Sequence, residues 1–138
     1  MKSIGENAFI FCKDLTSIEI QDGVENIEQY AFSNCSNLNL VEFPNSIKQI
    51  DAKAFENTAW LSNRQKEHPL VIVNDLLVDG TTCKGDVKVP DGIQTICSFA
   101  FNNCKLSSIE IPNTVTYIGE SAFIWCEELS TIKFSDNV

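Results

Sequence analysis

Apolar residues recur along the chain in one repeated order. The order opens with an isoleucine, and these isoleucines are Ile4, Ile27, Ile50, Ile96 and Ile118, which lie 23, 23, 46 and 22 residues apart. An Ala-Phe pair, a cysteine, a leucine and two apolar residues one position apart then follow in most copies. Self-similarity at such a period predicts a stack of equivalent structural units.

Two kinds of spacing alternate within each unit. The Phe, Cys and Leu positions step by three, which fits a short helical turn with its apolar side inward. The closing pair, Ile18 and Ile20 in the first unit, steps by two and fits a short strand with one buried face. We therefore predict an α/β repeat solenoid with short parallel strands on one face and short helical turns on the other.

The predicted repeats form a single domain over residues 1–138 and stabilise one another by stacking. They span 4–26, 27–49, 50–95, 96–117 and 118–138. The first and last stretches, Ile4–Val24 and Ile118–Val138, are identical at 11 of 21 positions. Because the chain opens and closes within a repeat, we expect bare apolar faces at both ends and a fragment or module of a longer array. A complete small protein that pairs end to end is the alternative.

The third repeat, 50–95, is twice the usual length. It contains two β-rich runs around Asn74 and Asp75, which predict a hairpin with a tight turn. We interpret this segment as one elongated repeat with a hairpin insertion docked on the stack. Two repeats, one of them degenerate, remain an alternative.

The pattern Ile-x-x-x-Ala-Phe-x-x-Cys-x-x-Leu-x-x-Ile-x-Ile-Pro-x-x-Val-x-x-Ile resembles the BspA-type, or Treponema pallidum-type, leucine-rich repeat. The resemblance covers essentially the whole chain. It implies a curved, leucine-rich-repeat-like solenoid. Better-known members are bacterial surface proteins that attach to host matrix proteins or to other microbes, so the resemblance implies a location at the cell surface or in the secreted fraction. It predicts shape far better than partner.

The charge balance narrows the class of partner. Ten basic and 19 acidic residues give a net charge of -9. Such a surface repels phosphate backbones and anionic lipid, so we expect no nucleic acid and no membrane surface as a partner. No apolar run has the length of a membrane span, so we expect no membrane insertion. The start of the chain has no apolar stretch of signal-peptide type.

Six cysteines raise the question of disulfides or metal. Four share one repeat position, and these are Cys12, Cys35, Cys104 and Cys126. Equivalent side chains on stacked strands run parallel about 4.8 Å apart, which suits buried free thiols better than bridges. Cys83 and Cys97 fall outside this register, and we expect Cys97 to be exposed. A Cys83–Cys97 bridge remains open, and the lack of Cys-x-x-Cys argues against zinc.

Catalytic chemistry has no recognisable candidate in the sequence. His68 is the single histidine and stands in a polar run beside the expected hairpin, where a solvated loop residue is expected. No phosphate-binding glycine loop or metal-binding helix occurs. We predict no enzyme, no catalytic residue, no metal and no cofactor.

A protein ligand is expected to bind the strand face. Residues beside and between the paired apolar positions point away from the core. The predicted partner-binding residues are Ser17, Glu19, Leu40, Glu42, Asp86, Lys88, Ser108, Glu110, Thr131 and Lys133. The predicted hairpin, 70–78, is a second candidate contact. We therefore expect a protein-binding module of an adhesin-like surface or secreted protein. A structural spacer or intracellular scaffold without a specific ligand is the alternative.

Overall fold

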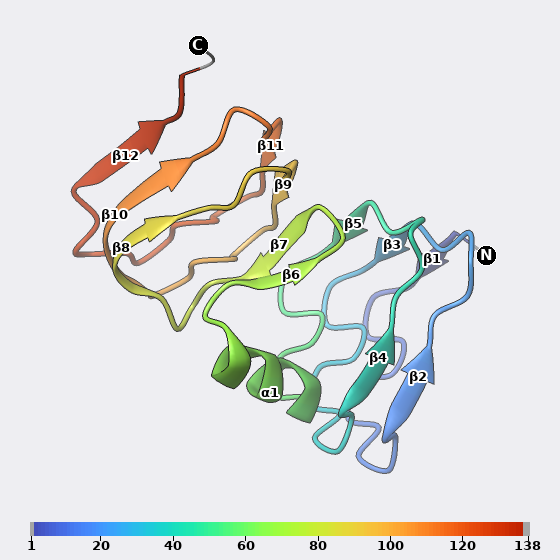
Figure 1. Cartoon of the computed structure of the whole chain (residues 1–138). Helices are drawn as coiled ribbons and strands as arrows, with labels where there is room; N and C mark the ends of the chain where they lie inside the picture. Colours follow the sequence, from blue (N-terminus) through green and yellow to red (C-terminus); the bar gives the residue numbers. More distant parts are fainter. Residues whose placement is uncertain (1, 137–138) are drawn as a thin grey trace. The chain divides into compact units, whose positions relative to one another are not determined.

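The chain folds into two compact units, Met1–His68 and Pro69–Val138 (Figure 1). The computed structural model describes residues 2–136, so Met1, Asn137 and the closing Val138 of the last predicted repeat lie outside the described part. Each unit is built from short strands that recur once per turn of chain, and the two are described in order.

The first unit is a parallel stack of turns. One sheet has the order β1-β3-β5, and its strands are Ser3–Ile4, Asn26–Ile27 and Gln49–Ile50. Ile27 pairs with both Ile4 and Ile50 in this sheet. A second sheet pairs β2 (Ser17–Glu19) with β4 (Leu40–Glu42). Each residue thus pairs with the one 23 positions later, as the sequence period predicts.

The second unit repeats this arrangement and adds an antiparallel pair. Its two sheets have the orders β11-β9-β7-β6 and β12-β10-β8. The strands are β6 (Val71–Val73), β7 (Leu76–Asp79), β8 (Lys84–Lys88), β9 (Thr95–Ile96), β10 (Lys105–Ile111), β11 (Tyr117–Ile118) and β12 (Thr131–Phe134). Strands β6 and β7 run antiparallel, and the other pairs are parallel.

The segments between the sheets, predicted as short helical turns, are chains of tight turns. In the first turn, the N–H groups of Ala8 and Ile10 bond locally to carbonyls three residues back, whereas those of Asn7, Phe9 and Phe11 bond to the next turn. The residues three and seven positions after each opening isoleucine have positive φ, and these are Asn7, Phe11, Tyr30, Asn34, Lys53, Asn57, Phe99, Asn103, Ser121 and Trp125. A left-handed residue every fourth position cannot continue an α-helix. Half of the amides are therefore free to link neighbouring turns.

Phenylalanine rings stack along the core of each unit. Phe32 lies between Phe9 and Phe55, with ring centroids 5.2 Å apart on both sides and planes 5° and 9° from parallel. In the second unit Phe101 stacks on Phe123 at 5.1 Å and 4°. Phe32 and Phe101 are fully buried. The Ala-Phe pair of the repeat therefore builds a column of stacked rings in each unit.

Helix α1, Ala59–Glu67, takes the place in the third turn where the first two turns have a strand (Figure 1). Thr58 stands at the cysteine position of the repeat, and its Oγ1 accepts a hydrogen bond from the N–H of Leu61 at 3.2 Å. A threonine at the N-cap favours a helix, which a cysteine would not. Trp60 anchors the helix because its ring packs on Phe55, with centroids 4.8 Å apart.

Strand β7 is a regular rung of its sheet, because Leu77 pairs with Ile96 and Ile96 with Ile118. The hairpin predicted as an insertion docked on the stack is thus partly built from the stack itself. Leu77 stands where the other turns have isoleucine, and Gly80 stands where they have phenylalanine, since its N–H bonds to the carbonyl of Ala100.

Three cysteine predictions were wrong. Cys12, predicted as a buried thiol of the repeat, is exposed because it lies in the first turn of its unit. Cys83 is buried and follows Gly80 by three residues, which places it at the cysteine position of the repeat. The prediction that Cys83 lies outside the repeat register is therefore wrong. Cys97 is only 4% exposed, because it directly follows β9, which lies between β7 and β11. In the described residues all six cysteines are free thiols, and Cys83 and Cys97 are not bridged.

Candidate functional site

The strand face of the first unit exposes four of the predicted partner-binding residues. Ser17 pairs with Leu40, and Glu19 pairs with Glu42. All four side chains are exposed, and Leu40 is 52% accessible. Val41, between Leu40 and Glu42, points inward and is buried. Strands β2 and β4 therefore present two carboxylates on paired positions beside an exposed leucine.

The strand face of the second unit holds the other six residues in two rows. Asp86, Ser108 and Thr131 form one row by their pairing, and Lys88, Glu110 and Lys133 form the other.

Within each of these two rows, neighbouring side chains contact one another. Ser108 Oγ donates to Asp86 Oδ1 at 2.6 Å, and Lys88 Nζ lies 3.9 Å from Glu110 Oε1. Ser135 Oγ also donates to Glu110 Oε1, at 2.8 Å. The ten predicted residues thus lie in two sets, four in the first unit and six in the second.

The predicted hairpin contact offers little side-chain surface. Leu70, Val71, Val73, Leu76 and Leu77 are buried. Asn74 at the turn is the exposed residue of the segment, with φ of 54°. The apolar run that predicted a hairpin therefore serves the core of the second unit.

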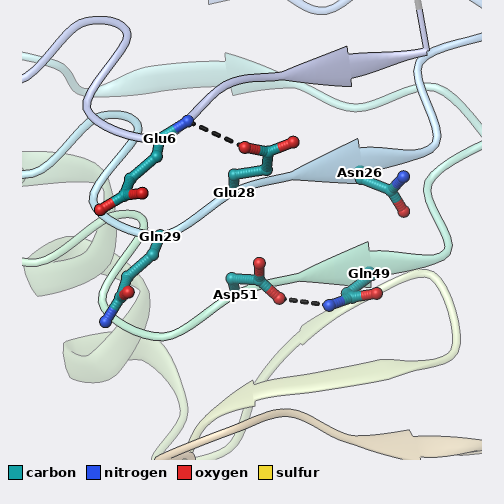
Figure 2. Close-up of a pocket in the computed structure, with 6 residues that line it drawn as sticks. All are labelled: Glu6, Asn26, Glu28, Gln29, Gln49 and Asp51. Atoms are coloured by element: carbon teal, nitrogen blue, oxygen red, sulfur yellow. Dashed lines mark hydrogen bonds between the residues drawn. The ribbon is translucent and has the colours of Figure 1, made fainter.

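A polar groove in the first unit was missed by the sequence analysis. It encloses about 300 Å³ and is lined by Glu6, Asn26, Glu28, Gln29, Gln49 and Asp51 (Figure 2). The Glu6 N–H donates to Glu28 Oε2 at 3.0 Å, and Gln49 Nε2 donates to Asp51 Oδ1. These residues flank the ladder isoleucines of β1, β3 and β5, where polar residues recur in the sequence. That recurrence was the available signal.

The groove can accept hydrogen bonds from a cationic or amide group through its carboxylates and carboxamides. Outside the lining residues, the Lys48 ammonium donates a hydrogen bond to Glu25 at 2.9 Å, and this bond lowers the pKa of the Glu25 carboxyl. No group of three or more His, Cys, Asp or Glu side chains among residues 2–136 is placed to hold a metal ion.

Two thiols of the repeat link neighbouring turns through hydrogen bonds. Cys35 Sγ donates to the carbonyl of Phe9, and Cys126 Sγ donates to that of Phe101, each at 2.9 Å. Burial raises the pKa of Cys83 to about 11 and that of Cys104 to about 12. A thiol with so high a pKa carries almost no thiolate at neutral pH and is a poor nucleophile.

Across the described part of the chain, no helix has the length and apolar character of a membrane span.

A search of curated proteins gave no match. Among solved structures, similar ones include a leucine-rich repeat protein of T. pallidum (26% identity, 94% of this chain and 50% of the other, TM-score 0.47). Another is a leucine-rich repeat protein from Bacteroides ovatus (30% identity, 95% of this chain and 28% of the other, TM-score 0.47). A third is a leucine-rich cell surface protein of Faecalibacterium prausnitzii (23% identity, 98% of this chain and 52% of the other, TM-score 0.47). This chain covers half or less of the length of the first two proteins.

The family model for the BspA-type leucine-rich repeat region matches residues 2–75 and 79–138, with six copies. Six is one more than the number of predicted repeats, and β7 accounts for the difference as the first strand of a further turn. This favours the alternative in which 50–95 contains two repeats. With 134 of 138 residues matched (74 and 60), the chain belongs to the BspA-type leucine-rich repeat family.

Proposed function

We propose that this chain is a non-enzymatic protein-binding module of an adhesin-like protein at the cell surface or in the secreted fraction. Leucine-rich repeats are generally protein-interaction modules, and successive turns of a repeat protein offer an extended row of side chains to a partner. The strand face is the proposed contact.

One observation supports the strand face most directly. On β2 and β4 the outward residues Glu19 and Glu42 lie on paired positions, and both are exposed. Like charges placed side by side on neighbouring strands reduce stability. A partner that brings a lysine or arginine to this pair removes the repulsion, so the pair favours a basic segment of a protein ligand.

Leu40 adds an apolar contact beside the carboxylates. It is 52% exposed and lies across from Ser17 on the same face. A basic segment with an adjoining apolar residue therefore fits this patch. Glu110 in the second unit is less available, because Lys88 and Ser135 already contact its carboxylate.

A direct test is the capture of host matrix proteins by the immobilised chain. The double variant Glu19→Lys/Glu42→Lys reverses the paired charges, and we expect it to lose capture. Asp91→Lys serves as the control, because it reverses the charge of an exposed residue in the turn after β8 that is not among the ten predicted contact residues. Retained capture by the double variant would rule out this patch.

A structural spacer without a ligand is the second candidate. Aromatic residues, which carry much of the energy of protein interfaces, are absent from the ten predicted contact residues. A spacer would capture none of the matrix proteins, and its charge reversals would change nothing but net charge. Whether the wild-type chain captures any matrix protein is therefore enough to distinguish the two functions.

A further inference from the structure

Two cysteines of the second unit contact each other across neighbouring turns. Cys104 Sγ lies 3.5 Å from Cys126 Sγ. The two residues occupy the same repeat position in successive turns, 22 residues apart. Cys104 belongs to the hydrophobic core of this unit, and Cys126 packs against the same core. The contact is therefore made by side chains that the packing of the core holds in place.

The backbones of these two turns have a spacing that suits a disulfide. Just before Cys104, the N–H of Asn103 donates to the carbonyl of Ile124 at 2.9 Å. The N–H of Phe101 donates in the same way to the carbonyl of Ala122 at 2.8 Å. Chain segments bonded like this lie about 4.8 Å apart, and disulfides span Cα atoms roughly 4.4–6.8 Å apart. The sulfur atoms can therefore reach bonding distance by rotation of the two side chains and a small approach of their Cβ atoms.

A bridge at this position leaves the neighbouring carbonyl with a donor. In the reduced chain the carbonyl of Phe101 accepts hydrogen bonds from Cys126 Sγ at 2.9 Å and from the N–H of Cys104 at 3.2 Å. Oxidation removes the thiol proton and with it the first bond, whereas the second bond remains. The Phe101 carbonyl stays hydrogen-bonded, so the bridge avoids the cost of an unsatisfied buried acceptor.

We propose that Cys104 and Cys126 are a site of disulfide formation, with a low-molecular-weight disulfide as the oxidant. One cysteine thiolate attacks a sulfur of the oxidant, which forms a mixed disulfide and releases one small thiolate. The other cysteine thiolate then attacks the protein sulfur of the mixed disulfide, which forms the Cys104–Cys126 bond and releases the second small thiolate. The protein gives up two electrons and two protons, and the oxidant takes them up to become two small thiols.

Burial determines when this exchange takes place. It raises the pKa of Cys104 to about 12, and a buried, protonated thiol is a poor nucleophile. We therefore expect the bridge to form while the second unit folds and its turns are still open, and to form slowly in the folded chain. Disulfides persist in oxidising compartments outside the cell, so a surface or secreted location favours the bridged form. The exchange itself needs no partner on the strand face.

The bridge adds a covalent link between two turns that packing and backbone hydrogen bonds already join. It closes a loop between residues 22 positions apart, and a cross-link of this length stabilises mainly by restricting the unfolded chain. The oxidised chain should therefore melt roughly 5–10 °C above the reduced chain. This difference should be absent from Cys126→Ala.

Oxidative refolding tests the proposal directly. The wild-type chain is refolded from denaturant at pH 8 in a mixture of reduced and oxidised glutathione, its remaining thiols are alkylated, and it is digested with trypsin without reduction. Cleavage after Lys88, Lys105 and Lys133 places the two cysteines in separate peptides, 89–105 and 106–133. Mass spectrometry should find these two peptides linked, and dithiothreitol should separate them.

Variants assign the link to individual sulfur atoms, because Cys97 shares the peptide 89–105 with Cys104. Cys104→Ala and Cys126→Ala should each abolish the linked pair. Cys83→Ala is the matched control and should keep it, since Cys83 occupies the same repeat position one turn before Cys104. A refolded wild-type chain without the linked pair would overturn the proposal. A linked pair that persists in Cys104→Ala, or that is lost in Cys83→Ala, would also overturn it.

Discussion

The ring of Phe101 fills the space above Gly80. A Cβ added to Gly80 would lie 2.3 Å from Phe101 Cε1, well inside van der Waals contact. Gly80 occupies the phenylalanine position of its turn, so the column of rings ends there and the neighbouring ring covers the backbone directly. The φ of Gly80 lies outside the left-handed region, so its backbone conformation does not require glycine. Glycine is required because any side chain would meet the Phe101 ring.

Gly80→Ala is therefore expected to destabilise the protein by about 1–3 kcal/mol, since the buried Phe101 ring has to leave its position. Urea unfolding followed by circular dichroism measures the change. Gly5→Ala is the control, because a Cβ there meets nothing within 4 Å. Equal stability of the two variants would contradict the stated contact.

The stacked rings predict a difference between interior and terminal turns. Phe32→Ala removes a ring that is covered on both sides, and it is expected to cost about 3–5 kcal/mol. Phe9→Ala removes a ring that is 37% exposed and stacked on one side, and about 1–2 kcal/mol is expected. The midpoints of urea unfolding give both values. A larger loss for Phe9→Ala would show that the rings do not stack as described.

Left-handed positions in the tight turns predict a stabilising substitution. Lys53 has a φ of 57°, and Lys53→Gly should raise the free energy of unfolding by roughly 0.5–1 kcal/mol, because relief of strain exceeds the added chain entropy. Glu56→Gly is the matched control and should lower it by a similar amount. Both variants lose the same Lys53–Glu56 ion pair, which spans 3.5 Å at the surface. The opposite order would exclude a left-handed Lys53.

Buried thiols make stability depend on alkaline pH. Burial raises the pKa of Cys83 to about 11 and of Cys104 to about 12, from 9.0 for a free thiol. The folded chain keeps these protons while the unfolded chain loses them above pH 9, so stability is present below pH 9 and falls as the pH rises toward 11 or 12.

Denaturation between pH 8 and pH 10.5 measures this slope. We expect Cys83→Ala/Cys104→Ala to have lower stability at pH 8 and a shallower decline above pH 9 than wild type. Cys12→Ala, which replaces an exposed thiol, is the control and should keep the wild-type slope. An unchanged slope in the double variant would show that the two thiols stay solvated.

The sequence predicts the turns that keep the full set of repeat residues. Phe9 stacks on Phe32 in the first unit, and Phe101 stacks on Phe123 in the second, because Ala-Phe recurs at one offset from the ladder isoleucines. It misses the turn that begins at Leu77, because leucine and Gly80 replace isoleucine and phenylalanine there. Cys83 was misplaced for the same reason.

Local backbone geometry explains the other differences. A spacing of three suits an α-helix and a chain of tight turns equally, and the choice depends on the left-handed residues at positions such as Tyr30 and Lys53. Tyrosine and lysine give no signal for that conformation. The strand-face residues were found from alternation alone, whereas the groove around Glu28 and Asp51 combines polar residues from three successive turns.

The 23-residue register between Ile4, Ile27 and Ile50 has an evolutionary consequence. Excision of 27–49 would bring Ile50 next to Ile4 with the same residue types facing each other, and duplication of the segment would insert one more matched layer. Gene rearrangements in multiples of this length preserve the join, whereas gain or loss of a single codon shifts every later pairing. Length can therefore vary among descendants of such a gene while the joins between layers are kept.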